Sequence, residues 1–408
     1  MSKTYDVAII GAGPAGVSTA LFLIHQRPEL AGRIIVLEKA TFPRDKFCAG
    51  AIGARADAWL SEIGVHVDVP SVVIDGVSIA VADGAALSRL GRAGRVVRRM
   101  EFDHALVRIL EARGVKVLEG ARVTALTPGA DAVHIDTPGG AFLAKAVVGA
   151  DGVGSVVRRS LGLPFGGLHA QVVEVDTPPV PGDPPRDVLH FDAKNRSLVG
   201  YAWDFPTLVD GKALVCRGVY VLGIDRAPEA DATQLLAERL RERGLGLRDY
   251  RVKRFSERGF ELHRPFASNR ILLVGEAAGI DPIFGEGIAQ AIGYGRLAGR
   301  YLASKLGKDE LRFDDWTKHA ALSPLGIELA IRGVLVSGFY GELRPAVERL
   351  LVAIPDLMHL PMSLFAGRAP TLKALANAAS TGGLHLAKHV RGALLRVQSL
   401  LRSGIRPA

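Results

Sequence analysis

A cysteine stands in a segment with several charged residues, FPRDKFCAGAIG at positions 42–53. Cys48 is one of 2 cysteines in the chain, and Arg44 and Lys46 precede it closely. A thiolate is a nucleophile and a metal ligand, and nearby cations lower the pKa of a thiol. A cysteine is also a small apolar side chain that fills space in a core. Cys48 is therefore a candidate catalytic residue, with a packing role as the alternative.

Three glycines near the N-terminus have the spacing of a dinucleotide-binding turn. Gly11, Gly13 and Gly16 form G-x-G-x-x-G directly after the apolar run YDVAII. Such glycines allow a tight turn and a close approach of the backbone to a pyrophosphate, which binds at the N-terminus of the following helix. Glu38 ends the next apolar run, where a carboxylate accepts hydrogen bonds from an adenosine ribose. These residues predict a dinucleotide-binding βαβ unit.

Two later glycine clusters are similar to motifs of FAD-dependent flavoproteins. Residues 149–158 read G-A-D-G-x-x-S-x-x-R, which resembles a motif of flavoprotein monooxygenases and their relatives. Residues 275–287 resemble the second FAD motif of these proteins, in which a carboxylate holds the ribityl chain and a glycine loop opens a helix toward the flavin. The N-terminus of such a helix stabilises negative charge on a reduced flavin. This chain has Glu276 where the family usually has Asp, and the three clusters in this order imply FAD as the cofactor.

Two more segments resemble the geranylgeranyl reductase family of FAD-dependent oxidoreductases, a branch of the para-hydroxybenzoate hydroxylase-like flavoproteins. Residues 42–48 match its FPRDKxC segment, and residues 201–206, YAWDFP, match its Y-x-W-x-F-P motif. Flavin-dependent halogenases have a similar W-x-W-x-I-P motif, which fits less well because Tyr201 and Phe205 stand in place of its first Trp and its Ile. The chain departs from the family at Ala49, where glycine is usual, and at Leu198, where proline is frequent.

In that family the aromatic motif lines the pocket for an isoprenoid chain beside the flavin. The resemblance therefore assigns Tyr201, Trp203, Phe205 and Pro206 to substrate binding. Aromatic faces suit this role because they offer a large apolar area at a small cost in rotamer entropy. From the residues alone, alternating aromatic residues are also typical of a strand face that packs on a core.

The same resemblance assigns the residues that contact FAD. Arg98 or Arg99 corresponds to an arginine near the diphosphate, with a solvated surface arginine as the alternative. Cys48 is expected to lie over the flavin ring, where it would gate or position the substrate or assist its protonation. No metal ligands are expected. The expected FAD contacts are Gly11, Gly13, Pro14, Ala15, Gly16, Glu38, Lys39, Arg44, Cys48, Ala49, Arg98, Arg99, Val123, Asp151, Gly152, Gly275, Glu276, Pro282, Gly285, Gly287 and Ile288.

The implied reaction is reduction of a C=C bond in a hydrophobic, isoprenoid or lipid-like substrate by hydride from reduced FAD. An isolated alkene accepts hydride poorly, so the site must be dry and must hold the alkene close to the flavin. A monooxygenase (hydroxylase) or halogenase acting on an aromatic, polyketide-like or protein-borne substrate is the alternative, because the fold does not determine the reaction. A non-catalytic FAD-bearing scaffold is a third interpretation. No second G-x-G-x-x-G occurs in a strand-turn-helix context, so NAD(P)H in transient contact or a ferredoxin-like protein is the expected electron donor.

The elements around these motifs predict an α/β protein (α+β overall) with a Rossmann-like FAD-binding domain of the para-hydroxybenzoate hydroxylase-like type. Residues 5–38 read as strand, glycine turn, helix and strand, and residues 102–114 read as a helix with Asp103 as its N-cap. Residues 166–262 alternate in short strands typical of an antiparallel sheet. The expected division is a discontinuous FAD-binding domain (1–75, 96–165 and 263–312), an inserted antiparallel-sheet substrate domain (76–95 and 166–262) and a helical C-terminal region (313–408).

Composition and charge are those of a globular protein with a basic tail. Hydrophobic residues make up 48% and charged residues 23%, which is ordinary for an α/β protein. Two distant cysteines and the lack of a long apolar run predict a cytoplasmic protein. The net charge is +9, and only basic charges follow Asp356. Residues 384–402, written as a basic amphipathic helix, predict attachment to the inner face of a membrane, or docking on the protein itself. No motif for nucleic-acid recognition is present.

Overall fold

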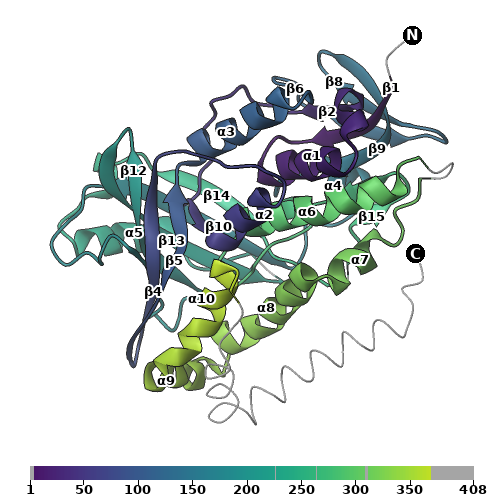
Figure 1. Cartoon of the computed structure of the whole chain (residues 1–408). Coiled ribbons are helices and arrows are strands. Elements are labelled where there is room, and N and C mark those ends of the chain that lie inside the picture. The colour runs from purple at the N-terminus through teal and green to yellow at the C-terminus, as the bar shows by residue number, and fades with distance from the viewer. Residues whose placement is uncertain (1–3, 226, 263, 308–310, 369–408) are drawn as a thin grey trace.

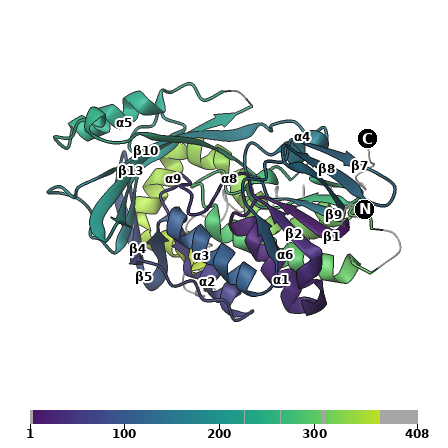
Figure 2. The ribbon, with the colours of Figure 1, turned by 90° about the horizontal axis from the view of Figure 1, so that it is seen from above.

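The computed structural model describes residues 4–225, 227–262, 264–307 and 311–368. Two sheets, each of 8 strands, lie at opposite sides of the molecule, and helices pack on and between them (Figures 1 and 2). This arrangement confirms the predicted mixed α/β class. The predicted amphipathic helix at residues 384–402 lies outside the described residues.

The first sheet is the parallel sheet that the N-terminal motif predicts. Its order is β15-β16-β9-β1-β2-β6, and the β7–β8 hairpin extends from β9. All neighbours from β16 to β6 are parallel. β1 is buried from its second residue onward because both of its faces are covered, so it reads as a continuous apolar run. The strands are β1 (Thr4–Ile10), β2 (Ile34–Leu37), β6 (Lys116–Leu118), β7 (Ala125–Pro128), β8 (Val133–Thr137), β9 (Gly140–Gly149), β15 (Ala267–Ser268) and β16 (Ile271–Leu273).

Two long helices beside this sheet pack on each other through small residues. α1 (Pro14–Gln26) follows the glycine turn, and α6 (Ile288–Lys305) crosses it closely. A Cβ at Gly295 would lie 1.9 Å from the Ser18 hydroxyl, and one at Gly299 would lie 2.6 Å from the Phe22 Cβ. Because such distances are too short for any side chain, these two glycines of α6 fix how closely the helices approach.

The second sheet lies in the left part of Figure 1. Its order is β14-β10-β13-β12-β11-β4-β5-β3. Every neighbouring pair is antiparallel except β11 and β4, which run parallel, so the predicted antiparallel sheet is correct for all but one pair. α5 (Ala232–Arg241) packs on β13 and β10. The strands are β3 (Ala51–Gly53), β4 (Ser71–Val81), β5 (Gly84–Val97), β10 (Leu168–Thr177), β11 (Val188–Asp192), β12 (Gly200–Val209), β13 (Lys212–Ile224) and β14 (Lys253–Arg258).

One expectation about residues 71–112 needs correction, and one stays untested. The predicted domain boundaries at residues 75 and 95 fall inside β4 and β5, whose pairing continues on both sides of a register shift between Ile74 and Gly76. The division into domains otherwise stays a prediction. Asp103 does not cap a helix: α3 begins at Arg99 and ends at Ala112, with Arg98 in the N-cap position. Asp103 is instead 1% exposed inside the helix, where it accepts two hydrogen bonds from Arg99 and forms an ion pair with Arg44.

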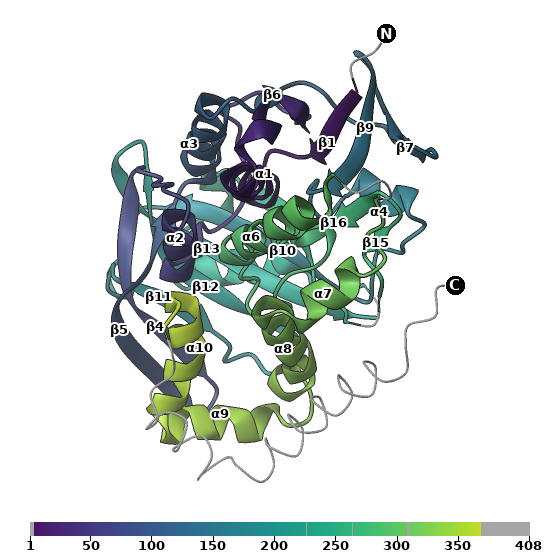
Figure 3. The same cartoon turned by 45° about the vertical axis from the view of Figure 1, so that its right-hand side comes forward.

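The described residues after 313 are helical, as predicted. α7 (Trp316–Leu322) and α8 (Pro324–Tyr340) lie beneath α6, and α9 (Arg344–Ala353) and α10 (His359–Ala366) turn back toward β5 (Figure 3). Among the described helices, none alone is long and apolar enough to cross a membrane. The bent pair α7–α8 meets those requirements of length and composition only when its two members are taken together. The remaining short elements are α2 (Ala54–Ser61), α4 (Val156–Ser160) and the 3₁₀ turns η1 (Pro28–Arg33), η2 (Leu247–Asp249), η3 (Gly275–Ala277) and η4 (Pro355–Met358).

Candidate active site

Two adjoining cavities lie between the sheets. The larger one, here called the polar cavity, has a volume of about 480 Å³ and opens at the carboxyl ends of β1, β2 and β9. Ligands of open parallel sheets bind at this end of the strands. The smaller one, the aromatic cavity, has a volume of about 130 Å³ and is walled by rings on the second sheet and by the C-terminal helices.

The glycine turn forms one end of the polar cavity. Gly11 has a φ of +104°, and a Cβ there would lie 2.5 Å from the carbonyl oxygen of Ala150. A Cβ at Gly16 would lie 2.0 Å from the carbonyl oxygen of Gly11, so this third glycine allows the turn to pack on the helix and does not line the cavity. No side chain caps the first turn of α1, whose N-terminus therefore presents backbone N–H groups and a partial positive charge.

Charged side chains surround the same turn. The Glu38 carboxylate accepts hydrogen bonds from the backbone N–H groups of Ala12 (2.8 Å) and Ala40 (3.0 Å). Arg44 forms ion pairs with Glu38 and Asp103, and its buried Nη1 atom has no hydrogen-bond partner within the protein. An unpaired guanidinium N–H beside a helix N-terminus is suited to an anionic group.

The second glycine cluster serves mainly to fix the structure. The Asp151 carboxylate accepts hydrogen bonds from the Ser155 hydroxyl and from the backbone N–H of Val156 (2.7 Å), so it holds the start of α4 while also lining the polar cavity. Burial raises the pKa of this carboxyl, although these hydrogen bonds oppose the change. Arg158 donates to the carbonyl oxygens of Pro164 (2.9 Å) and Ala277 (3.2 Å), and the second contact ties this cluster to the third.

The third glycine cluster separates the two cavities. Glu276, Gly285, Gly287 and Ile288 line the polar cavity, and all of these except Glu276 also line the aromatic cavity. Gly287 is the N-cap of α6, and no side chain caps this helix. The partially positive N-terminus of α6 is therefore directed at the place where the cavities meet.

Most of the residues predicted to contact FAD line the polar cavity, and five do not. Gly16 and Gly275 support the packing of the turns, Ala49 faces the aromatic cavity, and Pro282 is absent from both walls. Arg98 is also absent, because it pairs with Asp176 at 3.2 Å, whereas Arg99 lines the cavity and binds Asp103. The predicted residues on the wall are Gly11, Gly13, Pro14, Ala15, Glu38, Lys39, Arg44, Cys48, Arg99, Val123, Asp151, Gly152, Glu276, Gly285, Gly287 and Ile288.

The predicted substrate residues form a continuous aromatic face on β12. Tyr201, Trp203 and Phe205 line the aromatic cavity, with centroids of neighbouring rings 6.1 Å apart. A Cβ at Gly218 on β13 would lie 2.1 Å from the Trp203 ring, so this glycine provides the space that the indole occupies. Pro206 does not line the cavity, because successive residues of a strand point to opposite faces.

Three tyrosine hydroxyls hold the loop between the cavities. Tyr201 donates to the carbonyl oxygen of Phe284 (2.6 Å), Tyr220 to that of Pro282 (3.0 Å) and Tyr340 to that of Ile283 (2.6 Å). The tyrosines come from β12, β13 and α8, so three separate elements fix one short segment. Pro282, predicted to touch FAD, is here an anchor of the loop.

Cys48 lies where the cavities meet and lines both of them. Its backbone N–H donates to Glu174 (3.2 Å), and its Sγ accepts from the backbone N–H of Gly50 (3.4 Å). Burial raises the pKa of the thiol, and the cation that opposes this is Arg99. A reactive thiolate would require a lowered pKa, which nearby cations such as Arg44 and Lys46 can cause; here burial outweighs the nearby positive charge, and the thiol stays protonated at neutral pH.

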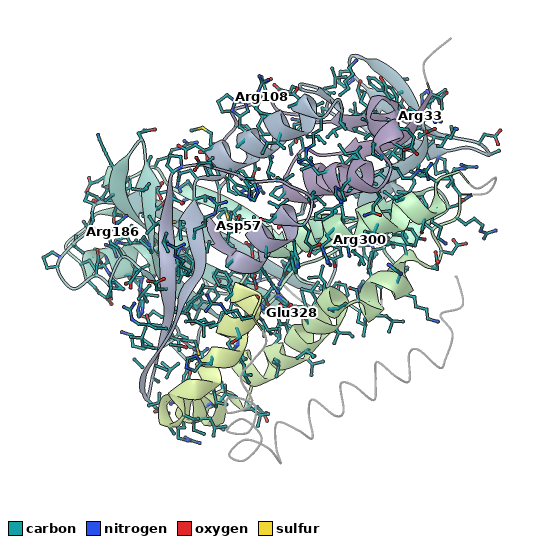
Figure 4. All side chains as sticks on the ribbon, viewed as in Figure 1. Arg33, Asp57, Arg108, Arg186, Arg300 and Glu328 are labelled. Carbon is teal, nitrogen blue, oxygen red and sulfur yellow. The ribbon has the colours of Figure 1, made fainter. Side chains whose placement is uncertain are left out.

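A buried charge network joins the C-terminal helices to the site. Arg332 on α8 binds Asp281 and, at 3.0 Å, Glu286 of the loop before α6. Arg55 on α2 binds Glu286 and Glu328 at 2.7 Å each, and Glu328 is labelled on α8 in Figure 4. Removal of any one partner would leave an uncompensated buried charge, so the network fixes where α8 lies against the loop.

Several residues of the site are absent from the sequence-based prediction. That prediction places Asp103 at a helix cap and does not include Glu257, Phe255 and Tyr220. Glu257 and Phe255 line both cavities, and Tyr220 lines the aromatic one. An available signal was the alternation in β14, where Phe255 and Glu257 stand on the same strand face as Lys253.

The polar cavity fits a flavin dinucleotide on its own features. It has a glycine cradle, two uncapped helix N-termini and an unpaired arginine N–H for the diphosphate. Its volume lies in the ordinary range for ligand pockets, ~300–1,000 Å³. Among the described residues, no group of three or more His, Cys, Asp or Glu side chains is arranged to hold a metal ion.

Comparison with known proteins identifies the family. The model of the family described as FAD binding domain matches residues 4–311, so the chain belongs to this family and FAD is its cofactor. The chain is 28% identical to menaquinone reductase of Mycobacterium tuberculosis, with 74% of this chain and 77% of the relative covered. It is 29% identical to digeranylgeranylglycerophospholipid reductase 1 of Methanopyrus kandleri, with 75% and 82% covered. The predicted resemblance to geranylgeranyl reductases is confirmed by such relatives.

Solved structures share the fold. A geranylgeranyl bacteriochlorophyll reductase-like protein from Thermoplasma acidophilum superposes with a TM-score of 0.66 at 18% identity, covering 96% of this chain and 99% of that one. A flavin-dependent brominase superposes with a TM-score of 0.68 at 18% identity, covering 97% and 100%. The fold is therefore common to proteins named for different reactions, and the chain is an FAD-dependent oxidoreductase whose reaction depends on its own site.

Proposed function

We propose that this FAD-dependent oxidoreductase reduces a C=C bond in a hydrophobic, isoprenoid or lipid-like substrate. The observation that carries the proposal is the aromatic cavity, which adjoins the polar cavity and is built from rings and aliphatic side chains. An alkene carries no charge and few hydrogen-bonding groups, so it is bound by apolar contact area. The relatives named above support this substrate class, because their names refer to menaquinone and to a digeranylgeranyl lipid, both of which bear isoprenoid chains.

FAD and the residues of the chain together provide three conditions for such a reaction. FAD, when bound and reduced, supplies the hydride. The rings of Tyr201, Trp203 and Phe205 exclude water and restrict where an apolar chain can lie. The glycine loop held by the three tyrosine hydroxyls keeps the N-terminus of α6 fixed at the junction, where its partial positive charge stabilises developing negative charge.

Cys48 is proposed to position the alkene at the passage between the cavities. Its protonated thiol is compact and apolar, and the backbone bond to Glu174 and the Gly50 contact fix its orientation. A reactive thiolate is not required for this role. The predicted FAD contacts that line the polar cavity are consistent with this positioning role of Cys48.

The partners of the reaction remain those proposed from the sequence. The electron donor is proposed to be NAD(P)H in transient contact or a ferredoxin-like protein. The protein is proposed to be cytoplasmic and to reach lipid substrates at the inner face of a membrane through its basic tail.

Anaerobic single turnover tests the proposed reaction directly. The FAD-loaded protein is reduced without oxygen and mixed with a prenyl diphosphate or a prenylated lipid, and flavin absorbance and product mass are followed. Reoxidation with a product heavier by two hydrogen atoms supports C=C reduction. Reoxidation only after oxygen is admitted, with a product heavier by one oxygen atom or carrying a halogen, would establish the monooxygenase or halogenase alternative instead.

Cys48→Ala tests the proposed role of the cysteine. The variant should retain FAD, because the thiol makes no contact that builds the diphosphate end of the cavity, and it should lose turnover by roughly 100-fold through poorer alignment of the substrate. Flavin content and single-turnover rate are the measurements. Cys216→Ala, which removes the buried thiol on β13, is the matched control and should keep the rate. Full turnover of Cys48→Ala would leave only the packing role.

A further inference from the structure

Glu257 is a carboxyl group on the wall shared by both cavities. It lies on β14 and faces inward together with Phe255, two residues before it. A Cβ built on Gly285 would be 2.5 Å from the Glu257 Oε2 atom and 3.3 Å from the Tyr220 ring. The glycine of the loop therefore leaves the space in which this carboxyl group stands.

The Oε2 atom is shielded from solvent and has no hydrogen-bond partner in the protein. No arginine or lysine forms an ion pair with this carboxyl among the described residues, in contrast to Glu174 on the neighbouring strand, which pairs with Lys253 at 3.0 Å. An unpaired carboxylate in such a place is costly, whereas a neutral carboxylic acid has a proton to donate.

The charged groups around Glu257 favour the neutral form. Burial raises the pKa of the Glu257 carboxyl well above its ordinary range, and the carboxylates of Glu276, Asp281 and Glu174 raise it further. Lys46, on the loop after β2, opposes them. Burial and the neighbouring carboxylates therefore favour the protonated form of this carboxyl, at the edge of an apolar cavity.

We propose that Glu257 is a catalytic acid that delivers a proton to the substrate carbon in C=C reduction. This inference rests on the proposed function. The O–H bond of the carboxyl breaks and a C–H bond forms at one alkene carbon, while the other carbon receives the hydride that the reduced dihydroflavin supplies. The carboxylate that remains regains its proton from water that reaches it through the polar cavity.

Cys48, the other protonated group at the junction, is less suited to this transfer. Its Sγ accepts a hydrogen bond from the Gly50 N–H and lies near the Arg99 guanidinium. The Oε2 atom of Glu257 has no such contact, so its proton is free to point at a ligand. A carboxylic acid is also intrinsically a stronger acid than a thiol.

Glu257→Gln keeps the shape of the side chain and removes the acidic proton. Infrared spectroscopy of the FAD-loaded protein at neutral pH should show a protonated carboxyl band that shifts in D₂O, persists above the ordinary carboxyl pKa range and is missing in this variant. Glu242→Gln, at an exposed position after α5, is the control and should keep the band. Absence of the band in the wild-type protein would overturn the proposal.

Single-turnover kinetics complete the test. Glu257→Gln should retain FAD affinity and flavin reduction, and its reoxidation by a prenyl substrate should fall by about 100-fold or more. A variant that loses FAD, or that reduces the alkene at the wild-type rate, would overturn the proposed acid role while the proposed function stands. A wild-type protein that does not reduce the alkene would overturn the proposed function itself, and the infrared band would still report the protonation state of Glu257.

Discussion

The polar and aromatic cavities share a wall but are built by different means. The polar cavity depends on backbone: glycines without room for a Cβ, helix N-termini, and a few ion-paired side chains such as Arg44 and Glu38. The aromatic cavity depends on side chains, with rings from β11, β12 and β13 packed edge to face or stacked. Backbone geometry recurs wherever a dinucleotide binds, whereas side chains are free to differ between relatives. The backbone-built cavity that fits the cofactor is thus separate from the ring-lined cavity that we propose binds the substrate.

A side chain at the third glycine should have the largest effect and should destroy the polar cavity. Gly16→Val places atoms where even a Cβ would lie 2.0 Å from the Gly11 carbonyl oxygen, so the turn cannot pack on α1. We expect complete loss of bound FAD, measured by the flavin absorbance of the purified protein. Gly32→Ala is the control, because a Cβ at Gly32 would meet nothing within 4 Å. Retention of FAD by Gly16→Val would show that the turn is more adaptable than its geometry indicates.

Removal of the central ring should weaken the aromatic side alone. Trp203→Ala leaves an empty space beside Gly218, and we expect the free energy of unfolding to fall by about 3–5 kcal/mol while FAD affinity changes little. Denaturant unfolding and flavin titration measure the two quantities. Phe165→Ala, at a residue that is 49% exposed, is the control and should lower the free energy of unfolding far less. An equal loss of FAD affinity in Trp203→Ala would contradict the independence of the two cavities.

Loss of the Arg44 guanidinium, whose Nη1 atom has no partner in the protein, should have the smallest effect. It should lower FAD affinity and leave stability nearly unchanged. Arg44→Gln removes a charged donor from the polar cavity, and FAD should bind more weakly by about 2 kcal/mol, roughly 30-fold in Kd. Stability should change little because Asp103 keeps both hydrogen bonds from Arg99, at 2.7 Å each. Arg108→Gln, on the exposed part of α3 labelled in Figure 4, is the control for charge. Isothermal titration of the apoprotein with FAD is the measurement.

The sequence predicted the polar cavity far better than the aromatic one. G-x-G-x-x-G predicts the turn well because its three glycines are close in sequence and the geometry they allow is local. The turn between β1 and α1 has the predicted form. Glu257 and Arg332 could not be found in this way, because each acts through contacts with residues distant in sequence. Asp103 shows the same limit: its type and position suit a helix cap, and only the fold reveals two arginines on it. The resemblance places Cys48 over the flavin ring, which stays a prediction, and the direction in which its pKa shifts depends on burial that no local pattern records.

The C-terminal helices that carry Arg332 affect the order in which the two cavities can form during synthesis. The polar cavity is lined by residues no later in the chain than Ala291, whereas the aromatic cavity needs Arg332 and Phe365. Because the N-terminal part of a chain leaves the ribosome first, the cradle for FAD can form before its neighbour has a complete wall. A nascent chain that still lacks its C-terminal helices exposes Tyr201, Trp203 and Phe205 to water. Early binding of the cofactor would shorten the time in which this aromatic face can aggregate.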